Sequence, residues 1–88
     1  MGFKIENGLL REYIKTPGET SVVVPNGVIK IAHGAFEYCA GIKSVSLPDS
    51  LLEIGGKAFC GCKKLTKINI PKSVERIGTD AFDETKLI

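Results

Sequence analysis

The chain has 88 residues, of which 43% are hydrophobic and 25% are charged, and its formal net charge is +2. This composition is typical of a folded protein and argues against disorder, and the charge is too small to predict a nucleic-acid partner. No apolar run approaches the roughly 18 residues that span a bilayer, and the first residues lack the basic-then-apolar order of a secretory signal. We expect a single soluble domain over residues 1–88, without membrane insertion and without a compartment that its sequence reveals.

Residues 3–14 carry alternating apolar side chains around Asn7-Gly8. Asn-Gly is the strongest short signal for a β-hairpin, because both residues accept the positive φ of a tight turn. The following Thr16-Pro17-Gly18-Glu19 has the composition of a turn. We predict that residues 1–19 form an N-terminal hairpin and turn, which lie outside the repeats that follow and cover their first edge.

From residue 20 onward the chain repeats every 23 residues, with Pro25, Pro48 and Pro71 keeping the phase. The recurring apolar rows are Val22, Val45 and Ile68; Val24, Leu47 and Ile70; Val28, Leu51 and Val74; Ile31, Ile54 and Ile77; Ala35, Ala58 and Ala81; Phe36, Phe59 and Phe82; and Ile42, Leu65 and Ile88. Such a period predicts a solenoid, in which each repeat buries its apolar face against its neighbours. The repeats are residues 20–42, 43–65 and 66–88.

Each repeat has three predicted parts. It begins with a short strand that ends at the proline, because proline has no N–H to donate to a ladder. A corner or second short strand follows, and we interpret Gly55 and Gly78 after it as bend residues. The Ala-Phe pair then lies in a segment long enough for one helical turn. We expect the phenylalanines to stack about 4.8 Å apart along the solenoid axis.

The complete pattern, I-x-I-P-x-S-V-x-x-I-G-x-x-A-F-x-x-C-x-x-L, is best represented in residues 45–65 and 68–82. It resembles the BspA-type, or treponemal, leucine-rich repeat family over residues 20–88. Gly27, Ala32 and Thr85 depart from the pattern, in the first and last copies. The resemblance implies a leucine-rich-repeat solenoid of α+β class, and it also implies that such arrays are often parts of longer surface or secreted proteins.

The cysteines are the side chains with the most chemical potential. Cys39 and Cys62 hold the same position in adjacent repeats, and we interpret them as buried packing residues, with a disulfide or redox role as the alternative. Cys60 aligns with acidic residues in the other copies, so we predict an exposed thiol. A zinc site made of the three cysteines and His33 is disfavoured, because Cys60 and Cys62 lack the two-residue gap of zinc ligands.

Catalytic motifs are missing from the sequence. It contains no phosphate-binding loop, nucleophile elbow or paired catalytic carboxylates at a recognisable spacing. We therefore expect no enzyme activity, no catalytic residue, no cofactor and no metal. The predicted function is that of a non-enzymatic module that binds a protein partner, with no nucleic acid involved.

The candidate binding residues lie on the outside of the predicted sheet. Because side chains alternate along a strand, the inward direction of Val22 and Val24 turns their neighbours outward. The outward set is Ser21, Val23, Ser44, Ser46, Lys67 and Asn69. Such a face is the usual ligand surface of repeat proteins. Ile29 and Leu52 form a second, apolar candidate, since the third copy has Glu75 at their position.

The C-terminal edge of the third repeat is the last candidate surface. No atypical segment follows this repeat to cover its apolar rows. Two interpretations remain open. Either two chains meet as a homodimer at this edge, or the chain is a structural spacer or fragment of a longer bacterial-type surface or secreted repeat protein.

Overall fold

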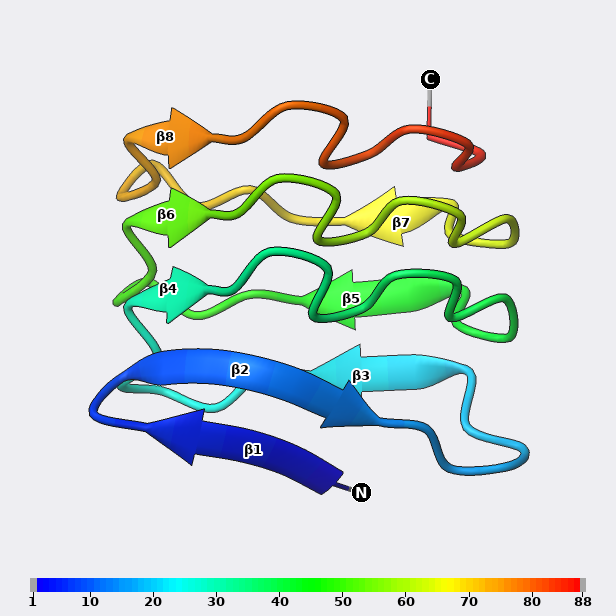
Figure 1. Ribbon diagram of the computed structural model, residues 1–88, viewed down its shortest axis with the longest axis horizontal. Helices are drawn as coiled ribbons and strands as arrows, with labels where there is room; N and C mark the ends of the chain where they lie inside the picture. Colours follow the sequence, from blue (N-terminus) through cyan, green and yellow to red (C-terminus); the bar gives the residue numbers. More distant parts are fainter. Residues whose placement is uncertain (1, 88) are drawn as a thin grey trace.

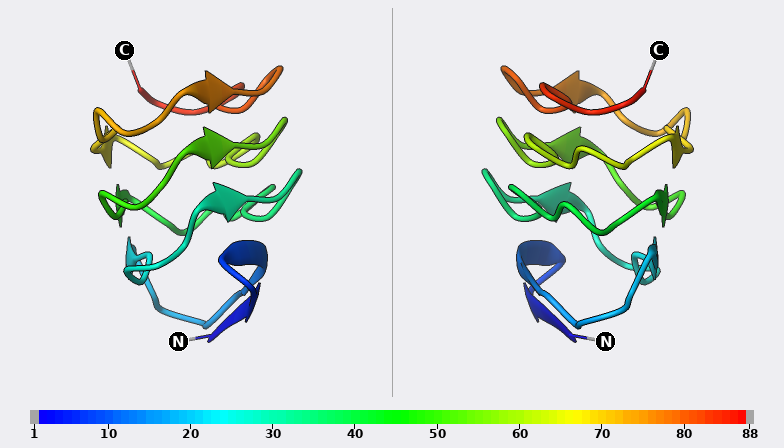
Figure 2. Two further views of the ribbon diagram at one scale, coloured as in Figure 1. Left: turned by 90° about the vertical axis from the view of Figure 1, so that its left-hand side faces the viewer. Right: turned by 90° about the vertical axis from the view of Figure 1, so that its right-hand side faces the viewer.

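The computed structural model describes residues 2–87, which wind into three stacked coils on top of an N-terminal hairpin (Figure 1). Within these residues, the strands are β1 (Gly2–Glu6), β2 (Leu9–Ile14), β3 (Ser21–Val23), β4 (Lys30–Ile31), β5 (Ser44–Ser46), β6 (Glu53–Ile54), β7 (Lys67–Ile68) and β8 (Arg76–Ile77). They form a five-stranded sheet of order β1-β2-β4-β6-β8 and a three-stranded sheet of order β3-β5-β7. The strands of the two sheets lie on different sides of each coil (Figure 2).

The 23-residue period is visible directly in the strand pairing. Val45 of the second copy lies opposite Val22 of the first and Ile68 of the third, and Ile54 lies opposite Ile31 and Ile77. All of these pairings are parallel. Each copy is therefore one coil, and the predicted solenoid of leucine-rich-repeat type is confirmed.

The N-terminal hairpin is part of the solenoid as well as its cover. β1 and β2 pair antiparallel around Asn7 and Gly8, which both have positive φ. β2 then pairs in parallel with β4. Tyr13, which lies 23 residues before Phe36, stacks on the Phe36 ring with centroids 5.1 Å apart. The prediction that the hairpin lies outside the repeat register was therefore wrong for its second strand, which serves as a partial coil.

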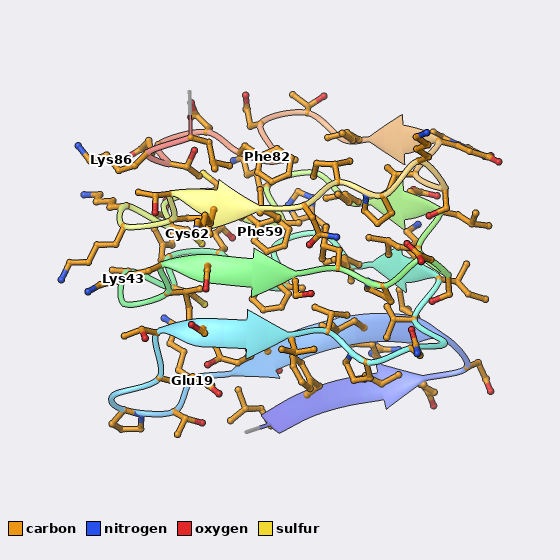
Figure 3. All side chains as sticks on the ribbon, turned by 180° about the vertical axis from the view of Figure 1, so that it is seen from behind. Glu19, Lys43, Phe59, Cys62, Phe82 and Lys86 are labelled. Carbon is orange, nitrogen blue, oxygen red and sulfur yellow. The ribbon has the colours of Figure 1, made fainter. Side chains whose placement is uncertain are left out.

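Aromatic rings form a continuous stack through the core. The ring centroids of Phe36 and Phe59 are 4.8 Å apart, and those of Phe59 and Phe82 are 5.4 Å apart, with nearly parallel planes. Figure 3 shows Phe59 and Phe82 one above the other. The predicted stacking is confirmed, and Tyr13 extends it at the hairpin end. Burial, together with its hydrogen bond to Glu19, raises the pKa of Tyr13 to about 12, so this phenol stays neutral at physiological pH.

The Ala-Phe segments do not form the predicted helical turn, and residues 2–87 contain no helix. The reason is that their backbone bonds to the next coil. The Phe36 N–H donates to Ala58 O at 2.7 Å, and Phe59 makes the equivalent bond one coil further on, at 2.8 Å. Gly34 and Tyr38 also have positive φ, which ends any right-handed turn around them. The third side of the solenoid is thus a ladder of tight turns.

Gly55 and Gly78 are required because two coils approach closely, and their interpretation as bend residues was wrong. Neither has a positive φ. A Cβ at Gly55 would lie 2.7 Å from His33 N in the neighbouring coil, and one at Gly78 would lie 2.4 Å from a backbone nitrogen. The first copy carries Ala32 at this position, where the neighbour is the hairpin strand β2 and not a full coil.

One residue of the predicted rows cannot be placed. Ile88, the expected partner of Ile42 and Leu65, lies outside the described residues, as does Met1. Ile42 and Leu65 themselves are buried. The described part of this row therefore agrees with the predicted core.

Gly55→Ala is expected to lower the free energy of unfolding by about 2–3 kcal/mol, because the added methyl group must push two coils apart. Gly41→Ala is a matched control, since its Cβ would lie 3.9 Å from the nearest atom and its φ is not positive. We expect the control to be neutral or slightly stabilising. Urea unfolding followed by circular dichroism measures both, and equal stability of the two variants would contradict the close-approach argument.

Candidate functional site

The outer face of β3, β5 and β7 brings together the residues that alternation predicted. Figure 3 shows these three strands side by side. Val22 and Val45 are buried beneath the sheet, whereas Val23 is 62% exposed. The strands enclose a shallow hollow of about 390 Å³, and the side chains that the strands direct outward around it are those of Ser21, Val23, Ser44, Ser46, Lys67 and Asn69. The sheet face, as we call this set, is thus one continuous surface.

Some side chains of the sheet face already form hydrogen bonds within the protein. The Ser44 hydroxyl donates to the Ser21 Oγ at 3.0 Å. Asn69 uses its whole amide on the neighbouring coil, because its Oδ1 accepts from Leu47 N at 2.8 Å and its Nδ2 donates to Leu47 O at 3.0 Å. Asn69 therefore continues the ladder beyond the end of β7. It has a structural role that sequence alternation could not reveal.

The sheet face combines polar, charged and apolar groups. Its serine hydroxyls donate and accept hydrogen bonds, Lys67 carries the positive charge of the set, and Val23 supplies apolar contact. Ser46 lies in the central strand β5, where a larger side chain would not displace the core beneath. These groups are suited to contacting a polar protein surface.

Ile29 and Leu52 form a separate surface. Their side chains are 46% and 41% exposed. They occupy equivalent positions in neighbouring coils, and the Leu52 N–H donates to Ile29 O at 2.8 Å. They come just before β4 and β6 in the chain, so they belong to the other sheet and do not extend the sheet face. Ile29 also packs over the hairpin turn at Gly8, which accounts for part of its role.

All three cysteines are free thiols, and all three are buried. The predicted exposure of Cys60 was therefore wrong. Its Sγ and carboxylate oxygens of Asp83 and Glu84 lie within 4.8 Å of one another, so the last coil covers it. Burial, followed by the charge of Asp83, raises the pKa of Cys60 and keeps it a neutral thiol.

The sequence combination of three cysteines and His33 does not gather at one place. Within residues 2–87, the group of potential metal ligands that lies close together is Cys60, Asp83 and Glu84. Both carboxylates are exposed, and exposed acidic groups of this kind are common without a metal. We therefore assign no metal site to them.

A second hollow, which sequence reasoning missed, lies between the turn before β3 and the first coil. It has a volume of about 270 Å³, and its walls include Tyr13, Lys15, Glu19 and Cys39. The Tyr13 hydroxyl donates to the Glu19 carboxylate, and both residues line the hollow. The signal available in the sequence was that Tyr13 lies in phase with Phe36, which places the turn after it beside the first coil.

Three solved structures resemble the chain. A leucine-rich repeat protein of T. pallidum is 34% identical with a TM-score of 0.79, over 86% of this chain and 37% of that one. A leucine rich cell surface protein from Faecalibacterium prausnitzii is 30% identical with a TM-score of 0.75, over 91% of this chain and 25% of that one. A leucine-rich repeat protein from Bacteroides ovatus is 26% identical with a TM-score of 0.66, over 98% of this chain and 31% of that one.

The chain spans between 25% and 37% of the length of these three proteins. A search of curated proteins gave no match. Nothing in residues 2–87 forms a helix with the length and hydropathy that a bilayer crossing requires. The family model described as the BspA type leucine rich repeat region matches residues 12–88, so its match begins within β2, where the structure places the partial coil. The chain belongs to the BspA-type leucine-rich repeat family.

Proposed function

We propose that the chain is a non-enzymatic module that binds a protein partner through the sheet face. The observation that carries this proposal is the row of outward groups on three parallel strands with a buried, closely packed layer behind them. A partner that docks there meets a surface whose backbone is already fixed, so binding orders few groups. The shallow shape favours a protein surface over a small molecule, because small ligands are usually enclosed in deep pockets.

The surroundings of the module are part of the proposal. The F. prausnitzii relative is a cell surface protein by description, and this chain covers 25% of it. We propose that the three coils act within a longer bacterial-type surface or secreted repeat protein. Neighbouring repeats would then extend the sheet face strand by strand, as repeat proteins commonly build their binding surfaces.

Ser46→Arg is expected to weaken binding of the partner about tenfold or more, because a long charged side chain at the centre of the sheet face blocks docking. Thr79→Arg, on the turn side of the solenoid, is the control and should leave the affinity within about twofold. Asn69 is unsuitable for this test, because changing it also breaks two hydrogen bonds to Leu47.

The partner is first identified with a photo-crosslinking amino acid at position 46 and, as a control, at position 79. It is then purified and titrated against the wild type and both arginine variants. We expect position 46 to capture the partner. Equal capture at both positions, or an unchanged affinity of Ser46→Arg, would contradict the assignment of the sheet face.

A second candidate function is association through the C-terminal edge, which we define as the outer side of the third coil. Ile77 is 50% exposed, whereas its equivalents Ile31 and Ile54 are fully buried. Phe82 is only partly buried, whereas the Phe59 ring beneath it is fully buried. These apolar rows are the surface that another coil would cover. We propose that a second copy of the chain covers them in a homodimer when no further repeat does.

Light scattering across a concentration series tests this edge. We expect a dimer that resists reductant and is lost in Ile77→Lys, because a buried charge opposes the apolar contact. Ile5→Lys is the matched control, since Ile5 is similarly exposed, at 42%, but lies at the hairpin end. A monomer at every concentration would rule out the homodimer and leave the edge for a further repeat.

A further inference from the structure

Cys39 and Cys62 converge on one backbone oxygen. The Cys62 thiol donates to Phe36 O at 3.1 Å, and the Cys39 N–H donates to the same oxygen at 3.2 Å. The two residues hold equivalent positions in the first and second coils, which lie one strand spacing apart. Both side chains are buried, at 4% and 1% exposure. Figure 3 labels Cys62, in the loop that leads into β7. The fold therefore brings the Cys62 thiol and the Cys39 backbone to the same oxygen between the first and second coils.

The two thiols differ in their access to a hollow at the surface. Cys39 lines the hollow of about 270 Å³ next to the first coil, together with Lys15 and Glu19, whereas Cys62 is not among the residues that line it. A small oxidant that enters this hollow meets Cys39 first. Cys62 is only 1% exposed.

The two thiols also differ in acidity. Interaction with the Cys62 side chain lowers the pKa of Cys39, and the charge of Lys15 acts in the same direction, against the effect of burial. The same interaction, followed by burial, raises the pKa of Cys62. Because the thiolate is the nucleophile, Cys39 is the thiol suited to attack an oxidant. Cys62 supplies the second sulfur, and its thiol proton passes to the sulfenic hydroxyl as that group leaves.

We propose that Cys39 and Cys62 form a reversible disulfide between the first and second coils when the protein meets a hydroperoxide. The Cys39 thiolate attacks one peroxide oxygen and breaks the O–O bond, which gives a sulfenic acid and releases hydroxide. The Cys62 sulfur then attacks the Cys39 sulfur and displaces the sulfenic hydroxyl, which leaves as water with the proton from Cys62. In total, two thiols and one hydrogen peroxide give one disulfide and two waters.

This proposal is independent of the proposed binding function. Neither cysteine belongs to the sheet face or to the C-terminal edge. The covalent bond would join two coils that are otherwise held by hydrogen bonds and packing, and would close the loop of chain between positions 39 and 62. Coil three would remain outside the cross-link. The disulfide would thus be an oxidation site that is separate from the sheet face and from the C-terminal edge.

The test uses the full chain with Cys60→Ala, which removes the third thiol and allows one pairing within the chain. One equivalent of hydrogen peroxide is added under native conditions, and intact mass and peptide mapping follow. We expect a loss of 2 Da, a single linked peptide pair containing positions 39 and 62, and full recovery with dithiothreitol. The reaction should be about tenfold faster in native buffer than in strong denaturant, because the fold holds the thiols together.

Single replacements separate the two roles. With Cys62→Ser in the same background, Cys39 should accumulate a sulfenic acid that a dimedone-type reagent traps. With Cys39→Ser, Cys62 should react at least about tenfold more slowly, because it is shielded and protonated.

Three results would overturn the proposal: over-oxidation of Cys39 without pairing, disulfide-linked dimers in place of the internal bond, or equal rates in native and denaturing buffer. The last result would mean that the fold does not hold the two thiols in a position to pair.

Discussion

Hydrogen bonds between neighbouring coils are the interaction on which the rest of this structure depends. The repeat strands have only two or three residues, and the hydrogen bonds within a single coil are those of tight turns, such as Ala58 N–H to Gly55 O. The ladder continues on every side, with the Gly55 N–H donating to Ile31 O at 2.8 Å and the Phe59 N–H donating to Ala81 O at 2.8 Å. Such a ladder requires close coils. That requirement explains why glycine stands at positions 55 and 78 and why flat aromatic rings fill the centre.

The 23-residue period predicted most of the fold, and the local secondary-structure preferences of the segments predicted less of it. Rows of like residues predicted the parallel pairing and the stack of phenylalanines, because equivalent positions must meet when coils are one strand spacing apart. The Ala-Phe segments do not follow their helical preference, because their backbone forms hydrogen bonds with the next coil. A local sequence pattern cannot predict such bonds. Similarly, the close spacing of the coils, and not a positive φ, requires glycine at positions 55 and 78. Tyr13 shows that the 23-residue period extends into the hairpin. This signal is hard to recognise in the sequence, because the residues around Tyr13 follow the pattern of a hairpin and not that of the repeat.

The candidate site was likewise predicted only in part from the sequence. Alternation along the strands predicted which side chains of the sheet face point outward, because direction is a property of the backbone. It did not predict what each side chain does there: Asn69, expected only as an outward-facing candidate for binding, forms hydrogen bonds with the backbone of Leu47. Cys60 was likewise placed correctly in its row but is covered by carboxylates from the next coil. In this solenoid, the exposure of a side chain depends on the adjacent coil, whose equivalent position lies 23 residues away in the sequence.

Amide hydrogen exchange at a concentration where the chain is monomeric tests this dependence on neighbours most directly. Phe36 and Phe59 donate to the following coil, whereas no coil beyond the third is described for Phe82. We predict that the Phe36 and Phe59 amides are protected alike and that the Phe82 amide exchanges about a hundredfold faster or more, through local opening of the last coil. Equal protection at all three positions would show that each coil is stable by itself, and would contradict the account.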